Sequence, residues 1–150
     1  ESQLVDGFAV AEKIRKKYPE AFSLLSTQLV RFRYLDEGSA DLEATSPLIE
    51  TNPQGEVIAL RYNSRSAQTF TFSSEVMADY YDAYRLLGEL LHEPEACIEF
   101  RLDAGQLIIF DNQRVLHGRS AYEEGFRHLQ GCYADKDSLQ SLIRVLEAEK

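Results

Sequence analysis

Residues 110–119 read Phe110-Asp111-Asn112-Gln113-Arg114-Val115-Leu116-His117-Gly118-Arg119, a short apolar run that ends on a histidine and a glycine. Because Gly118 has no side chain, another stretch of backbone or a ligand can approach His117 closely. An imidazole at a strand end can bind a ligand, but more often it is a hydrogen-bonded structural residue. From this stretch alone, both interpretations of His117 stay open.

The segments around this stretch predict strands. Apolar residues dominate 96–102, 106–110 and 114–116, and polar turns separate these runs, so we expect three successive antiparallel strands. Residues 127–134 predict a further strand. Upstream, the side chains alternate from Leu29 to Tyr34 as in a strand that is buried on one face.

Two turn signals divide the middle of the chain. Residues 36–41 are acidic and turn-like, and the run Glu43 to Glu50 carries acidic side chains that we expect to be solvated. Asn52-Pro53-Gln54-Gly55 is a strong turn signal between two strand candidates, so residues 47–63 predict a β-hairpin.

Helical spacing marks the remaining segments. Residues 7–28 predict two short helices interrupted at Pro19, and Ser73 or Ser74 can cap the longest helix, which Pro94 stops. An amphipathic helix is expected from about Asp137 to Glu147, capped by Asp135 or Asp137. Taken together, the predicted strands and helices indicate a mostly β core with flanking helices, which is an α+β fold.

Aromatic and cysteine residues in these elements have structural explanations. Tyr80, Tyr81 and Tyr84 share a helical spacing, so we expect them to pack the long helix onto the sheet. Cys97 and Cys132 alternate with apolar residues, which predicts buried thiols.

Composition excludes several classes of function. The chain has 150 residues, enough for about one domain, and 44% of them are hydrophobic, enough for a core. With 25 acidic and 16 basic residues the formal charge is -9, which disfavours nucleic acid as a partner. No apolar stretch approaches the roughly 18 residues of a membrane helix, the N-terminus lacks a leader pattern, and two cysteines are too few for a disulfide scaffold. A cytoplasmic protein with no membrane partner is therefore expected.

A second candidate for ligand binding lies ten residues after His117. Arg127 stands in Gly125-Phe126-Arg127-His128-Leu129, at the start of a strand candidate. A guanidinium group there can bind the carboxylate of a small molecule through two parallel hydrogen bonds. A surface ion pair is the simpler interpretation in an acidic protein, so this residue alone does not decide the function.

Taken together, the runs 111–119 and 125–135 resemble the γ-butyrobetaine dioxygenase and trimethyllysine dioxygenase family of iron(II)- and 2-oxoglutarate-dependent oxygenases. The resemblance extends upstream through Leu60-Arg61-Tyr62-Asn63 to Gln3-Leu4-Val5-Asp6-Gly7, and so covers essentially the whole chain. It implies the carboxy-terminal part of a double-stranded β-helix, or jelly roll, as the fold of residues 1–150. Iron(II) is then the implied metal and 2-oxoglutarate the cosubstrate, with ascorbate as an optional reductant.

The resemblance also implies roles for four residues. His117 matches the last histidine of the iron-binding triad, and Arg127 matches the arginine that grips the distal carboxylate of 2-oxoglutarate. Tyr133 falls where the family has an aromatic wall around the trimethylammonium group of the substrate, which a ring face attracts by cation–π interaction. Asn63 matches the asparagine that binds the substrate carboxylate. A core tyrosine and a turn asparagine are the structural alternatives for Tyr133 and Asn63.

The chain departs from the family pattern at the metal site. The family's first two iron ligands come from a His-x-Asp motif, and none of His92, His117 or His128 is followed by such an aspartate. We expect His92 and His128 to be surface or structural residues and not replacements for the missing ligands. The chain also begins at Glu1 and not at Met, so we expect the carboxy-terminal portion of an oxygenase domain that lacks its amino-terminal part and is inactive as it stands.

The implied reaction is the hydroxylation of γ-butyrobetaine to carnitine, a small-molecule substrate with a trimethylammonium group. Trimethyllysine dioxygenase is the nearest alternative, because the same motifs suit both substrates, and another TauD-like oxygenase is also an alternative. A non-catalytic binding or assembly module is the alternative from another class. Since half a jelly roll would expose apolar core, we also expect self-association, with a homodimer as one form, or a rearranged partner surface.

Overall fold

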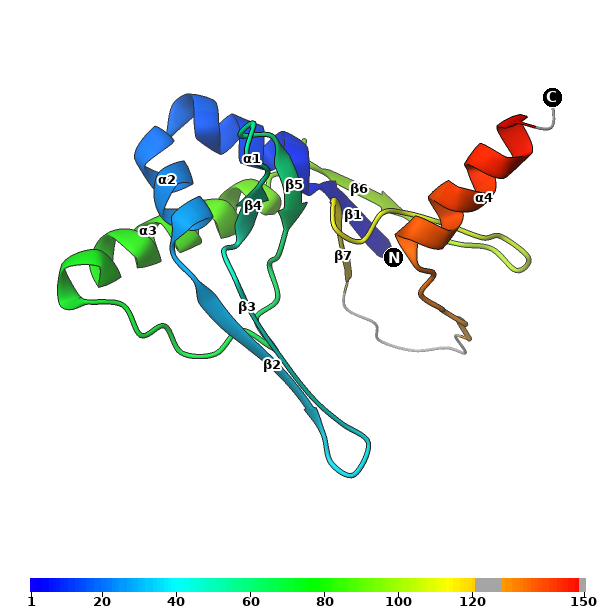
Figure 1. Ribbon diagram of the computed structural model, residues 1–150, viewed down its shortest axis with the longest axis horizontal. Coiled ribbons are helices and arrows are strands. Elements are labelled where there is room, and N and C mark those ends of the chain that lie inside the picture. Colours follow the sequence, from blue (N-terminus) through cyan, green and yellow to red (C-terminus); the bar gives the residue numbers. More distant parts are fainter. Residues whose placement is uncertain (121–127, 149–150) are drawn as a thin grey trace.

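The computed structural model describes residues 1–120 and 128–148, and it contains both helices and strands (Figure 1). The elements, in chain order, are β1 (Ser2–Asp6), α1 (Gly7–Lys17), α2 (Pro19–Thr27), β2 (Val30–Asp36), β3 (Ala40–Ser46), β4 (Ile49–Thr51), β5 (Val57–Leu60), α3 (Ser74–Leu91), β6 (Cys97–Phe100), β7 (Val115–Arg119) and α4 (Lys136–Ala148).

The predicted helices are confirmed. Pro19 separates α1 from α2, and α3 starts after Ser73 and is the longest helix in the described part of the chain. At the start of α4, Asp135 accepts hydrogen bonds from the backbone N–H groups of Asp137 and Ser138, so Asp135 is the cap of the two candidates.

The core lies between the first three helices and the strands beside them. α3 packs on α2 and α1, and α1 also contacts β5. Helical side chains therefore form much of the core, which differs from the expected β core with helices at its margins. The buried hydrophobic residues are Val5, Val10, Ala11, Ile14, Leu25, Val30, Phe32, Leu48, Ile49, Ala59, Leu60, Tyr80, Ala83, Leu87, Leu90 and Leu91.

The tyrosine stripe of α3 packs on aromatic side chains of the preceding loop. Tyr80 is fully buried, and its ring centroid lies 4.9 Å from that of Phe70 and 4.4 Å from that of Phe72. Tyr81 is 48% exposed. The prediction that the stripe packs on a sheet is wrong, because the loop before α3 folds back along the helix and covers it.

The sheets of the described residues are small and antiparallel. β1 lies in the middle of a three-stranded sheet of order β6-β1-β7, while β2 pairs with β3 and β4 pairs with β5. The pair β4 and β5 confirms the hairpin predicted over 47–63. The resulting architecture mixes helices and strands, with more residues in helices than in strands, and it does not confirm a jelly roll.

Two predicted strands are not present. Residues 106–110 form no strand, and Leu107 and Ile109 are 81% exposed. β6 and β7 do not pair with each other, because β1 lies between them and takes the hydrogen bonds of both. Residues 128–134 also form no strand. Apolar alternation shows that a segment suits a strand, but not whether a partner strand is available.

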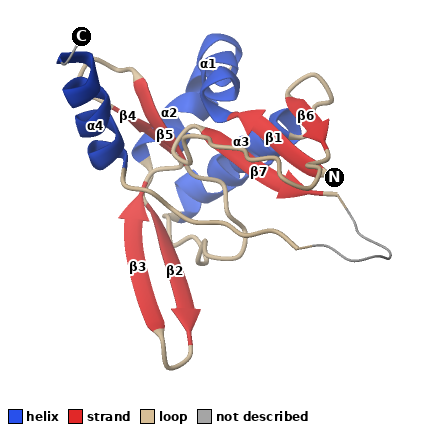
Figure 2. Cartoon of the chain, turned by 90° about the vertical axis from the view of Figure 1, so that its right-hand side faces the viewer, coloured by secondary structure: helices blue, strands red, loops and turns tan. Residues whose placement is uncertain are grey.

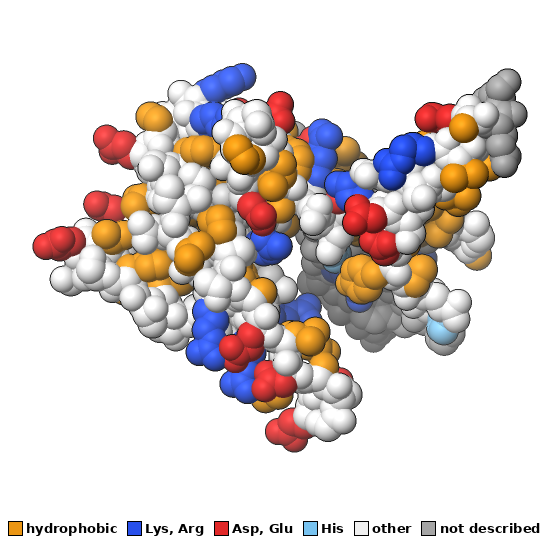
Figure 3. Space-filling model, viewed as in Figure 1, with side chains coloured by type: hydrophobic (Ala, Val, Ile, Leu, Met, Phe, Trp, Pro, Cys, Tyr) orange, Lys and Arg blue, Asp and Glu red, His pale blue; other side chains and the backbone are white. Residues whose placement is uncertain are grey.

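β2 and β3 form a long hairpin that projects from the body as an arm (Figure 2). Arg33 donates two hydrogen bonds of 2.9 Å to the carboxylate of Asp41, and Arg31 pairs with Glu43. Charged side chains accordingly gather on the arm (Figure 3). The sequence predicted the strand β2 and the turn that follows it, but β3 was missed because its residues were interpreted as an acidic surface.

None of the helices in residues 1–120 and 128–148 combines the length and the apolar character that crossing a membrane requires.

Gly7, at the corner between β1 and α1, offers a test of the packing. Its N–H donates a 2.9 Å hydrogen bond to the carbonyl oxygen of Arg114, and a Cβ atom there would lie 2.8 Å from that oxygen. Because the obstacle is backbone, we expect Gly7→Ala to lower the free energy of unfolding by about 1–3 kcal/mol in urea denaturation. Gly131→Ala is the matched control, since nothing lies within 4 Å of a Cβ there. Equal stability of the two variants would contradict the close packing of Gly7 against the backbone of Arg114.

Candidate functional site

A broad cleft of about 1400 Å³ brings most of the predicted site residues together. Asn63 follows β5, His117 lies in β7, and Tyr133 precedes α4, and all three line this cleft. Arg127 lies outside the described residues. Residues 70 positions apart in the chain thus meet at one surface, as a binding site requires.

The pairing of β7 with β1 positions His117. Its Cα partner is Leu4, and its side chain is exposed, with the imidazole ring centroid 5.2 Å from that of Phe110. Within residues 1–120 and 128–148, no group of three or more His, Cys, Asp or Glu side chains could hold a metal ion. An accessible imidazole can serve as one ligand of an iron centre, and the other ligands would have to come from elsewhere.

Three backbone contacts hold the segment that leads into β7. The N–H of Leu60 donates to the carbonyl oxygen of Gln113 at 2.9 Å, and Gly7 donates to that of Arg114. The N–H of Val115 donates to the carbonyl oxygen of Asp111 at 2.8 Å. The Lys136 ammonium at the start of α4 binds the Asp111 carboxylate at 2.6 Å, and this contact holds the pKa of Asp111 below its ordinary value. β7 is thus anchored at its beginning.

Asn63 is both a turn residue and a cleft residue. Its side-chain oxygen accepts a 3.0 Å hydrogen bond from the N–H of Arg65, which is the turn role that the sequence allowed. The carboxamide nitrogen has no hydrogen-bond partner among the described residues, and a nitrogen of this kind can donate to a carboxylate.

Tyr133 is 88% exposed, so it is not the buried core tyrosine of the structural alternative. It lies in the irregular segment before α4, where a strand had been expected. Cys132 beside it is exposed and Cys97 is half-buried, which corrects the prediction of two buried thiols. Side chains of this segment have few neighbours because it runs over the surface instead of joining a sheet.

His92 also lines the cleft, and its contacts support the structural interpretation. Its Nδ1 atom lies 2.7 Å from the carbonyl oxygen of Gly88, one turn earlier in α3. His128 is exposed in the segment before α4 and does not line the cleft.

The sequence did not predict that residues of the arm would line the cleft. Phe32, Arg33 and Tyr34 of β2 line it, and Tyr34 is 56% exposed. The alternation of aromatic and basic residues in β2 was visible in the sequence, but it did not indicate that the arm would lie beside residues 61–66. That placement rests on tertiary contacts, such as the 2.8 Å hydrogen bond from the N–H of Arg33 to the carbonyl oxygen of Ser66.

The cleft lining is basic although the chain as a whole carries a formal charge of -9. Arg33, Arg61 and Arg65 line it together with one acidic residue, Glu99. Arg33 is paired with Asp41 and Arg61 with Glu50, the latter at 2.8 Å, whereas Arg65 has no ion pair among the described residues. Arg65 is therefore the lining arginine whose charge is available to a carboxylate group.

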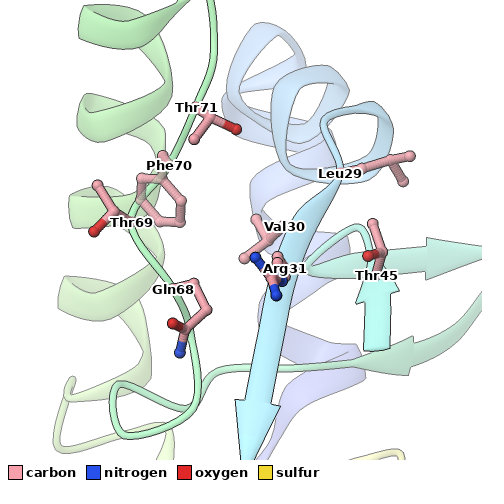
Figure 4. A pocket seen from close by; sticks show the side chains of 8 residues that line it. All are labelled: Leu29, Val30, Arg31, Thr45, Gln68, Thr69, Phe70 and Thr71. Atoms are coloured by element: carbon pink, nitrogen blue, oxygen red, sulfur yellow. The ribbon is translucent and has the colours of Figure 1, made fainter. Parts of the chain in front are cut away.

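A second, smaller cavity of about 390 Å³ lies between β2 and the segment 68–71 (Figure 4). Its lining holds none of the predicted site residues, and the guanidinium of Arg31 is already paired with Glu43. The N–H of Gln68 donates to the carbonyl oxygen of Arg31 at 2.8 Å, which holds this segment against the arm. We therefore take the larger cleft as the candidate site.

Comparison with known proteins identifies the family of the chain. Residues 1–133 match the family model "Taurine catabolism dioxygenase TauD, TfdA family". A gamma-butyrobetaine dioxygenase of Pseudomonas sp. (strain AK-1) is 45% identical over 148 residues, which cover 97% of this chain and 38% of the relative. The human gamma-butyrobetaine dioxygenase is 36% identical over 152 residues, covering 97% of this chain and 39% of the relative.

A mitochondrial trimethyllysine dioxygenase of Bos taurus is 34% identical over 148 residues, covering 95% of this chain and 35% of the relative. The chain thus spans less than two fifths of the length of these curated relatives, in their carboxy-terminal part. The family model covers most of the chain, and so the chain belongs to the TauD/TfdA family of dioxygenases.

Proposed function

We propose that this chain supplies the carboxy-terminal part of the active site of an iron(II)- and 2-oxoglutarate-dependent dioxygenase that hydroxylates γ-butyrobetaine to carnitine. The observation that carries the proposal is the meeting of Asn63, His117 and Tyr133 in one cleft. The relative with 45% identity, named gamma-butyrobetaine dioxygenase, supports the choice of substrate.

In this proposal His117 is one iron ligand. The chain contains no His-x-Asp motif, so the other two ligands come from outside these 150 residues, as does the remainder of the jelly roll. When bound, iron(II) would activate dioxygen, which is the oxidant for an unactivated C–H bond of the substrate and for 2-oxoglutarate, which is converted to succinate and carbon dioxide. Arg127 binds the distal carboxylate of 2-oxoglutarate through its guanidinium group.

The substrate is held at its two charged ends. The exposed ring of Tyr133 offers a face to the trimethylammonium group, for which cation–π attraction is suited. The carboxamide nitrogen of Asn63 donates to the substrate carboxylate, and Arg65, the lining arginine that has no ion pair among the described residues, favours negative charge at that end.

Trimethyllysine is the second candidate substrate, because relatives with the name trimethyllysine dioxygenase match nearly the whole chain at 34% identity. It also carries a trimethylammonium group and a carboxylate, so the same residues would serve. A reducing, cytoplasmic location is part of the proposal, supported by the two free cysteines.

Self-association of the isolated chain remains a prediction, with a homodimer as one form. Support comes from α4, which exposes an apolar stripe on the far side of the molecule from α1 to α3 (Figure 1). The exposed residues of the stripe are Leu139, Leu142, Ile143 and Leu146.

The test is succinate formation from 2-oxoglutarate with iron(II), dioxygen and ascorbate, with γ-butyrobetaine or trimethyllysine supplied separately. The full product of the gene and the isolated 150-residue chain are assayed side by side. We expect turnover with γ-butyrobetaine by the full product and none by the isolated chain. A preference for trimethyllysine would replace γ-butyrobetaine as the proposed substrate. If the full product turned over neither compound, the proposed reaction would be refuted.

A further inference from the structure

We propose that the ion pair between Asp6 and Arg114 locks the register of β7 and thereby positions His117 in the cleft. This inference rests on the proposed function, in which His117 is an iron ligand. Asp6 and Arg114 are then positioning residues, since neither is assigned a contact with iron or substrate.

The first step is that side-chain burial does little to fix the register of β7. It lies at an edge of the sheet of order β6-β1-β7, and its residues 117–119 are exposed while 115 and 116 are only half-buried. Register is strongly specified where one face of a strand is buried, and weakly specified where it is not. Backbone hydrogen bonds from Leu60 and Gly7 anchor the segment that leads into β7, and a side-chain contact at the same place would add to them.

The second step is the geometry of the pair. The Arg114 guanidinium donates two hydrogen bonds to the Asp6 carboxylate, Nε to Oδ1 at 3.1 Å and Nη2 to Oδ2 at 2.6 Å. Arg114 directly precedes β7, whose first residue, Val115, is the Cα partner of Asp6. A two-point contact of this kind defines both distance and orientation.

The third step is that Asp6 is itself fixed. Its Oδ1 atom also accepts the backbone N–H groups of Phe8 and Ala9, at 3.1 and 3.3 Å, so Asp6 is the N-cap of α1. α1 is anchored in the core through Val10, Ala11 and Ile14. The ion pair therefore connects an exposed edge strand to the most buried part of the molecule.

The consequence for His117 follows from strand geometry. In the observed register His117 is the Cα partner of Leu4. A slip by one residue would point the imidazole to the opposite face of the sheet, and a slip by two would move it about 7 Å along the strand. Neither position would keep His117 where it now is in the lining of the cleft that Asn63 and Tyr133 also line.

Asp6→Asn tests this inference, because asparagine retains the helix cap but loses the charge-assisted pair. The matched control is Asp41→Asn, which removes the corresponding two-point contact with Arg33 in the arm. In the full product of the gene we measure iron(II) affinity under anaerobic conditions. We also measure the nuclear Overhauser contacts between labelled Leu4 and His117, which report the register directly.

We expect Asp6→Asn and Arg114→Gln to weaken iron(II) binding by about tenfold or more, as the loss of groups that orient a metal ligand does. The Leu4–His117 contacts should weaken as well. Arg114→Lys should give an intermediate affinity because it restores one charged contact. Asp41→Asn should leave the iron(II) affinity and the Leu4–His117 contacts unchanged. Both Asp41→Asn and Asp6→Asn should melt close to the temperature at which the wild-type protein melts.

Wild-type affinity and wild-type Leu4–His117 contacts in Asp6→Asn would overturn the inference. If the wild-type protein binds no iron(II), the proposed function fails, while the Leu4–His117 contacts still decide whether the ion pair sets the register. A loss of iron affinity of equal size in Asp41→Asn would also overturn it, since the effect would then be unspecific.

Discussion

Replacing His117 with alanine is expected to lower 2-oxoglutarate-dependent succinate formation by the full product of the gene by at least about 1000-fold. The reason is that the iron centre of the proposed function would lose one of its three protein ligands, while the cleft around it is kept. The side chain of His117 is exposed, so its removal leaves no cavity in the core and the protein should still fold.

His128→Ala is the control for this experiment, because His128 is exposed and does not line the cleft. It should retain the activity of the wild-type protein. Far-ultraviolet circular dichroism of both variants checks that the fold is kept. Substantial turnover by folded His117→Ala protein would show that this histidine is not an iron ligand.

Tyr80 is the position where the largest effects on stability are expected, and with opposite signs. Tyr80→Ala should lower the free energy of unfolding by about 3–5 kcal/mol, because it removes a fully buried ring that packs on Phe70 and Phe72. Tyr80→Phe should raise it by about 1 kcal/mol, because the buried hydroxyl has no hydrogen-bond partner among the described residues. Urea denaturation of the three proteins measures both changes.

Tyr81→Phe is the control. Tyr81 is 48% exposed, so this substitution should change the stability little.

Burial, together with the neighbouring Tyr84, holds the pKa of Tyr80 well above its ordinary value. The unfolded state therefore releases this proton at lower pH than the folded state, and the stability that Tyr80 contributes is lost as the pH rises above about 10. Tyr80→Phe should not show this loss of stability at high pH. If Tyr80→Phe were less stable than the wild-type protein, the claim that the Tyr80 hydroxyl has no hydrogen-bond partner would be contradicted.

Local signals were enough to predict the helices and the short hairpin. Pro19 and Pro94 interrupt helices through their missing N–H groups, and Asn52 forms its turn by accepting the backbone N–H groups of Gln54 and Glu56. These effects act within a few residues of the chain, so they can be read without knowledge of the fold.

The partners of each strand could not be predicted in this way. Residues 106–110 have a good strand pattern and form no strand, whereas residues 2–6 were not identified as a strand and lie in the middle of a sheet. Strand pairing is decided by segments distant in the sequence, and here β1 occupies the position between β6 and β7.

The candidate site also has a part that could be predicted from the sequence and a part that could not. Resemblance to a family indicated Asn63, His117 and Tyr133, and all three line the cleft. The contribution of Arg33 and Tyr34 was missed, because it depends on where the arm lies in space. A strand pattern gives the two faces of β2 but not the surface that each face meets.

The position of β1 also has a consequence for the order in which the chain is made. Val5 pairs with Cys97 on one side and with Leu116 on the other, so both partners of β1 leave the ribosome long after it does. Until then α1, α2 and α3 can assemble, but the hydrogen-bonding groups of β1 are unpaired on both edges. Pairing across so long a stretch of chain is slow, and unpaired strand edges promote aggregation. Within these 150 residues, the late arrival of β6 and β7 is therefore the stage at which we expect aggregation to compete with folding.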